Sequence, residues 1–217
     1  MNAYVDLSLV LVLLTGVYVV YTSRLEACVK ATAIQGGALA LLPFLHFAQD
    51  RTSSLSHALL VGGSALVLKA ILIPYLLLRA MRAAKVKREV EPFVSTHVSV
   101  LLAACLMIIS FVLPPVLRLP LEHVAPLYVP TAFTTLLLGF LVIVSRRKAI
   151  TQVVGYLLVE NGAFVFGQSV AARLPFVVEL GVLLDLLVGV FVMGIVIHNI
   201  GREFDHIDVE KLNLLKG

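Results

Sequence analysis

Three ionisable side chains, Lys69, Glu160 and Asp185, lie near the middle of long runs of apolar residues. If these runs cross a membrane, each charge costs about 2.5 kcal/mol or more to insert, and such residues are typical of ion and proton paths. Burial and a nearby opposite charge together can bring a change of protonation close to neutral pH, as a proton relay requires. The three positions therefore predict a proton relay, or else a static salt bridge that fixes the register of the helices.

Two further titratable residues extend the candidate pathway. Glu179 precedes Asp185 by about 9 Å along a helix with a rise of 1.5 Å per residue, and His198 follows at the end of the last apolar run. The predicted proton pathway therefore consists of Glu160, Asp185, Lys69, Glu179 and His198.

A proline close to the lysine predicts an irregular helix at the same level. Pro74 has no amide hydrogen to donate to the carbonyl of Ala70, the residue that follows Lys69. We therefore expect the helix to bend beside the lysine and to leave the carbonyl of Ala70 as a free acceptor.

Long apolar segments must position these side chains. Hydrophobic residues make up 60% of the 217 residues and charged residues 14%, which is far from the composition of soluble domains. Runs of about 20 apolar residues recur, each long enough to cross a hydrocarbon core of about 30 Å. The chain is therefore predicted to be an all-α polytopic membrane protein with about seven transmembrane helices. We place these helices at residues 3–22, 29–48, 57–78, 94–114, 126–145, 150–170 and 176–199.

The distribution of Lys and Arg orients these helices. Most of these residues fall in the loops 23–28, 79–93 and 146–149 and in the tail from residue 200. The opposite loops hold three arginines, Arg51, Arg118 and Arg173. The positive-inside rule therefore places the N-terminus outside and the C-terminus in the cytoplasm. The net charge of +4 is explained by this anchoring, so we expect no binding to nucleic acid.

The chain divides into four segments. Residues 1–93 form an N-terminal three-helix segment that ends in a basic cytoplasmic loop, and residues 94–125 hold the fourth span and a Pro-rich external loop. Residues 126–200 contain the last three spans, and residues 201–217 form a cytoplasmic tail. The prolines of the external loop rule out one continuous helix there. They are Pro114, Pro115, Pro120, Pro126 and Pro130.

The sequence offers little to bind a metal or a redox cofactor. Cys28 and Cys105 are far apart, no Cys-x-x-Cys or His-x-x-x-His pair occurs, and the histidines are scattered. Glycine-rich nucleotide-binding patterns are also missing from the sequence. We therefore expect no catalytic residue, no metal ligand and no cofactor in this chain.

Three segments of the sequence resemble the hydrogenase-4 component E family, a membrane subunit of formate hydrogenlyase-type complexes. They are residues 146–162, 174–185 and 207–217. The last three spans also resemble the NuoK-like subunit of respiratory complex I. In that resemblance Glu160 matches the acidic residue of the subunit's second span. Asp185 stands where the subunit has a glutamate in its third span, which is a departure in residue type.

The resemblance implies a membrane subunit of a complex-I-like, energy-converting nickel–iron hydrogenase in the inner membrane of a prokaryotic cell. Such a subunit contributes to proton translocation and links antiporter-like subunits to the hydrogenase arm. It is a non-catalytic part of an oxidoreductase complex, whose metals belong to other chains. Two alternatives stay open on the residues alone. One is a structural or assembly subunit with static buried charges, and the other is a component of a cation/proton antiporter.

Overall fold

The computed structural model describes residues 3–49, 55–83, 94–116, 126–146 and 149–170, together with Leu187, Gly189 and Gly194. Six helices within these residues are long and apolar enough to cross a membrane. The prediction of an all-α polytopic membrane protein is therefore confirmed. The count of about seven spans and the orientation stay predictions, because most of the run 176–199 lies outside the described residues.

Eight helical elements form these six spans. The third span is continuous through α3, the π-helix η1 and α4. The elements are α1 (Ala3–Tyr21), α2 (Leu25–Gln49), α3 (Leu55–Ala65), η1 (Leu66–Leu72), α4 (Ile73–Ala83), α5 (Thr96–Val116), α6 (Tyr128–Ser145) and α7 (Ala149–Val170).

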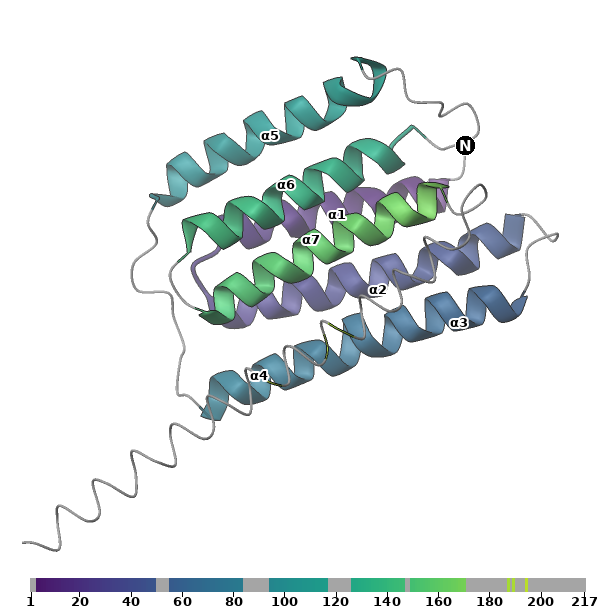
Figure 1. The fold of residues 1–217 in the computed structure, drawn as a ribbon, viewed down its shortest axis with the longest axis horizontal. Helices are drawn as coiled ribbons and strands as arrows, with labels where there is room; N and C mark the ends of the chain where they lie inside the picture. Colours follow the sequence, from purple (N-terminus) through teal and green to yellow (C-terminus); the bar gives the residue numbers. More distant parts are fainter. Residues whose placement is uncertain are drawn as a thin grey trace, which may run out of the picture.

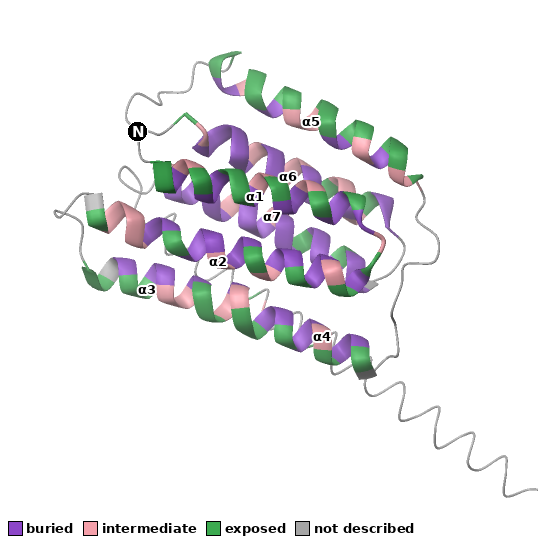
Figure 2. Cartoon of the chain, turned by 180° about the vertical axis from the view of Figure 1, so that it is seen from behind, coloured by how far each residue is buried: buried purple, intermediate pink, exposed green. Residues whose placement is uncertain are grey.

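The helices lie side by side with similar axis directions (Figure 1). In this view α5 lies at one edge and α3 with α4 at the other, while α6, α1, α7 and α2 lie between them. The longest helix–helix contact joins α6 to α7, and α2 contacts α1, α7 and η1. The buried residues gather on the central helices, whereas α5 exposes much of its surface (Figure 2). Apolar side chains on exposed faces suit lipid or a neighbouring membrane helix.

Glycines allow α6 and α7 to pack with their backbones in contact. A Cβ atom added at Gly139 would lie 2.6 Å from the backbone nitrogen of Val159. One added at Gly162 would lie 2.7 Å from the backbone nitrogen of Leu136. No larger residue fits at either position without moving a helix, as in other membrane helix pairs built on small residues. This close packing fixes the height and rotation of α7 against the bundle.

Beside Lys69, where the sequence predicts a bend, the chain forms a π-helical segment, Leu66–Leu72. The amide of Ile73 donates to the carbonyl of Leu68, five residues earlier, and Pro74 follows directly. Because Pro74 cannot donate to a carbonyl, the chain changes its hydrogen-bond spacing immediately before it. The extra residue in the π-helical turns displaces Lys69 from the position that a regular helix would give it.

Helices α2 and α4 extend beyond the predicted spans by a helical turn or more. Helix α2 begins at Leu25 instead of residue 29, and its first turns carry an exposed Glu26–Lys30 ion pair of 2.8 Å. Such pairs at a spacing of four residues stabilise helix ends. Helix α4 continues to Ala83, so the first residues of the predicted loop 79–93 are helical. Alanine, methionine and arginine in this stretch favour helix, and the arginine charges reach outward on long side chains.

The prolines assigned to the external loop lie partly inside helices. Pro114 and Pro115 belong to the last turn of α5, and Pro130 to the first turn of α6. A proline in a first turn is favourable, because the amides there have no partner within the helix. Helix α6 begins at Tyr128 after a turn at residues 126 and 127, and the rest of the predicted interruption, residues 117–125, lies outside the described residues.

Candidate functional site

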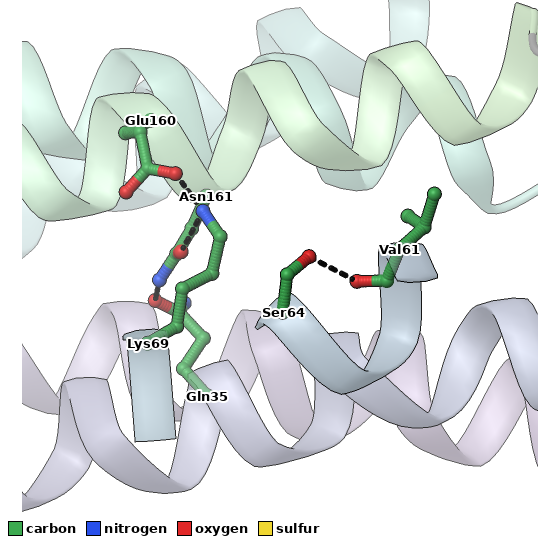
Figure 3. A network of polar contacts seen from close by, with 6 residues as sticks. All are labelled: Gln35, Val61, Ser64, Lys69, Glu160 and Asn161. Carbon is green, nitrogen blue, oxygen red and sulfur yellow. Dashed lines mark hydrogen bonds and ion pairs between the residues drawn. The ribbon is translucent and has the colours of Figure 1, made fainter. Parts of the chain in front are cut away.

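Lys69 and Glu160 form an ion pair in the interior of the bundle (Figure 3). Lys69 comes from η1 and Glu160 from α7, so the pair joins two helices that are far apart in the sequence. Each side chain is 2% exposed. Both charges are therefore shielded from solvent and from lipid by protein, the arrangement expected for charged groups inside membrane proteins.

A chain of neutral amides extends from the pair into α2 and α1. Lys69 Nζ donates to Asn161 Oδ1 at 3.2 Å, and Asn161 Nδ2 donates to Gln35 Oε1 at 2.8 Å. Gln35 Nε2 then donates to the backbone carbonyl of Val12 at 2.9 Å. Each amide donates in one direction and accepts from the other. The chain therefore presents an oxygen to the lysine and fixes the direction of every bond (Figure 3).

An aromatic ring and an apolar core surround the charges. Lys69 Nζ lies 5.1 Å from the centroid of the Phe164 ring, within the range of a cation–π interaction. Phe164 follows Glu160 by one helical turn on α7 and belongs to a buried apolar cluster that includes Leu39 and Val165. This low-dielectric surrounding strengthens the attraction between lysine and glutamate and makes either charge costly when it stands alone.

A glycine on α2 allows the lysine to reach this position. A Cβ atom added at Gly36 would lie 2.7 Å from Lys69 Cβ, 2.8 Å from its carbonyl carbon and 2.9 Å from its carbonyl oxygen. The backbones of α2 and η1 are thus in direct contact, and Gln35 next to Gly36 is brought to Asn161. Small residues of this kind permit close helix approach in membrane proteins.

The structure brings together two of the five predicted pathway residues, Lys69 and Glu160. Asp185, Glu179 and His198 lie outside the described residues. A role for any of the five in proton transfer stays a prediction.

The sequence did not single out Gln35 or Phe164, although both contact the site. A glutamine next to two glycines in an otherwise apolar helix was the available signal for Gln35. Hydropathy alone could not identify Phe164 as a site residue, because an aromatic residue within an apolar run does not differ from its neighbours in hydropathy. The contacts of both residues with the site follow from the packing of α2 against η1 and α7.

The site can hold, share and release a proton. Ammonium and carboxylate are the two titratable groups in contact. Asn161, held by Gln35, orients the ammonium without changing charge. Within the described residues, no three His, Cys, Asp or Glu side chains are grouped to hold a metal ion. The expectation that this chain binds no cofactor stays a prediction.

The chain is similar to proteins from several bacteria. It is 36% identical over 205 residues to the uncharacterized protein Rv0085 of Mycobacterium tuberculosis, covering 94% of this chain and 91% of that protein. It is 32% identical over 160 residues to hydrogenase-4 component E of Escherichia coli K12, covering 73% of this chain and 74% of the relative. Hydrogenase-4 component E of Shigella flexneri matches with the same identity and coverage. The sequence matches no protein-family model, and no solved structure matches the chain.

Proposed function

The chain belongs to the hydrogenase-4 component E family, and we propose that it is a proton-translocating membrane subunit of a hydrogenase complex. In this proposal the complex is of the energy-converting, formate hydrogenlyase type and lies in the inner membrane. The chain links antiporter-like subunits to the hydrogenase arm, and its last three spans act as a NuoK-like unit. Electrons pass through metals held by other chains.

The observation that carries the proposal is the buried Lys69–Glu160 pair halfway along its helices. Glu160 lies eleven residues, or about 16 Å, from the start of α7 at Ala149. Lys69 lies fourteen residues from the start of the third span at Leu55. Charged groups at that depth are expensive and are characteristic of ion paths.

The geometry supports a transfer in which the two groups act on each other. A proton that reaches Glu160 neutralises the carboxylate and removes the attraction that holds the Lys69 ammonium in place. The lysine then gives a proton to the next acceptor, and its neutral form takes one back when the carboxylate is charged again. Asn161 and Gln35 keep the lysine aligned throughout, because their bonds have one possible direction.

The surface supports membership of a larger membrane assembly. Helix α5 exposes many large apolar side chains along its length, and α3, η1 and α4 expose others. Figure 2 shows exposed residues along α5 at one edge of the bundle and along α3 and α4 at the other. Two separate apolar edges suit a chain that joins one membrane neighbour to another. Lipid can cover the same surfaces, so the partners are proposed from the family relationship.

A static structural role is the second candidate, and the same burial favours it. An ion pair that is fully enclosed and hydrogen-bonded on one side also fixes how η1 meets α7. The two roles predict different proton movement when Glu160 is replaced by a residue of the same shape that cannot carry a proton.

Replacement of Glu160 by Gln tests the proposal. The complex is purified by a tag on this chain, its subunits are identified by mass spectrometry, and it is returned to sealed vesicles. Reduced methyl viologen supplies electrons, hydrogen evolution is measured, and an acridine dye reports proton movement. Glu160→Gln should assemble and evolve hydrogen while proton movement falls about 100-fold, the scale on which positioned acid–base groups act. Glu160→Asp should keep part of the movement, because it retains the carboxyl group.

Each outcome separates the two roles. If Glu160→Gln translocates protons normally in an assembled complex, the relay is wrong. If adding Lys69→Met to Glu160→Gln restores both assembly and proton movement, the pair is structural, because neither titratable group is then present. Co-purified chains without nickel-binding or iron–sulfur cysteine motifs would contradict membership of a hydrogenase complex.

A further inference from the structure

A second polar cluster lies at the end of the bundle where α2 ends and α6 begins. His46 Nε2 and the Tyr128 hydroxyl are 2.6 Å apart, and their rings meet edge to face with centroids 5.6 Å apart. Tyr128 is buried and His46 is half-buried. A titratable ring thus connects a buried phenol to the more accessible end of the bundle.

Helix α6 carries a row of buried residues from this cluster towards the middle of the bundle. Positions 128, 131, 135 and 138 repeat every three or four residues and therefore share one face, with position 134 beside them. All of these residues are buried. In order along the helix they are Tyr128, Thr131, Thr134, Thr135 and Leu138.

Two hydroxyls in this row have no hydrogen-bond partner among the described residues, those of Thr131 and Thr134. Thr135, in contrast, donates to the carbonyl of Thr131, as threonines in helices commonly do. Buried hydroxyls are nearly always hydrogen-bonded in proteins, to protein atoms or to ordered water. Water molecules are therefore the natural partners of these two groups, and polar walls of this kind are where buried water is found.

The row meets the amide chain of the central site at Leu138. A Cβ atom added at Gly16 of α1 would lie 3.3 Å from Leu138 Cδ1 and 3.6 Å from Gln35 Nε2. Gln35 and Leu138 are therefore at one level of the bundle. Thr134 lies one turn from Leu138, and Thr131 and Tyr128 follow at steps of about 4.5 Å along the axis. One water molecule spans such a step, because two hydrogen bonds of about 2.8 Å cover it.

We propose that the hydroxyls of Thr134 and Thr131 line a hydrated proton path from the Lys69–Glu160 site, past Gln35, to the Tyr128–His46 pair. The proposal rests on the proposed function and adds the route by which the proton leaves or reaches the site. Each water or hydroxyl oxygen on the route accepts one proton and passes on another, so no group is changed after a transfer. The His46 ring nitrogen exchanges the proton at the end that the charge distribution predicts to be external.

The test is the Thr131→Val, Thr134→Val double variant in the assembled, vesicle-bound complex. Valine keeps the branched shape and removes the hydroxyl. Hydrogen evolution from reduced methyl viologen should continue, while dye-reported proton movement falls several-fold. The Thr131→Ser, Thr134→Ser double variant keeps both hydroxyls, so its proton movement should be normal. Ser99→Ala is the matched control: it removes a buried α5 hydroxyl with no partner among the described residues, and proton movement should stay normal.

The outcomes distinguish this path from the proposed function itself. Normal proton movement in the Val double variant, with loss in Glu160→Gln, overturns the path and leaves the central relay standing. Normal movement in Glu160→Gln removes the proposed function. If the Val double variant does not assemble, Tyr128→Phe decides: loss of movement supports the route, and normal movement overturns it. An equal loss in the Ser and Val variants also overturns it, because the hydroxyls then do not matter.

Discussion

Removing one partner of the Lys69–Glu160 pair should destabilise the protein more than removing both. Both side chains are 2% exposed, so Glu160→Gln alone, or Lys69→Met alone, leaves a buried charge without its counter-ion. Such a change typically costs about 3–5 kcal/mol. The double variant leaves no unpaired charge. It still loses the Lys69–Asn161 hydrogen bond, which leaves the amide oxygen of Asn161 without this donor at a cost of about 1–3 kcal/mol, and it loses the contact of the ammonium with Phe164.

The assay is equilibrium unfolding of the purified chain in mixed micelles, followed by far-ultraviolet circular dichroism because the chain contains no tryptophan. A single-variant loss of about 3 kcal/mol changes the folded-to-unfolded ratio more than 100-fold, since about 1.4 kcal/mol corresponds to tenfold. Glu26→Gln is the control. Its pair with Lys30 is exposed and spaced as on a helix surface, so its loss should cost about 0.5 kcal/mol or less. Additive costs in the Lys69–Glu160 double variant would refute an energetic coupling of the two charges.

Three other predictions concern packing, a buried arginine and topology. Gly36→Ala should cost about 1–3 kcal/mol in the same unfolding assay, because the added Cβ meets Lys69 Cβ at 2.7 Å and the η1 backbone at 2.8 and 2.9 Å. Gly37→Ala has open space around the added Cβ and should be neutral, so equal effects of the two changes would contradict the close contact. Arg146 is buried and donates at 2.9 Å to a carbonyl at the end of α1. Arg146→Ala should therefore lower the free energy of unfolding by about 1.5–3 kcal/mol. An unchanged midpoint of unfolding would show that this hydrogen bond does not contribute. Single cysteines at Ser54 and Lys148 should react with an impermeant thiol reagent from opposite sides of the membrane; labelling from one side refutes the predicted orientation.

The spans were predictable because the bilayer imposes a simple rule on the sequence. A segment that crosses it must satisfy its own backbone hydrogen bonds, and a long apolar helix is the solution when the chain is not a closed barrel. The ends were less predictable. Leu25 and Ala83 lie outside the predicted spans, because helix propensity and a surface ion pair extend a helix where hydropathy has already ended. Arg146 was read as a loop charge, and the structure shows it buried against α1.

The sequence by itself determined that Lys69 and Glu160 lie halfway along their helices and that the helix beside Lys69 is irregular. A constant rise of 1.5 Å per residue converts residue number into depth, and a proline acts on its own helix. The tertiary structure alone decided which groups meet. Rotation of α2 brings Gln35 to Asn161, and Gly36 admits the backbone of η1. These contacts depend on how several helices pack together, and the sequence of a single apolar run does not contain that information.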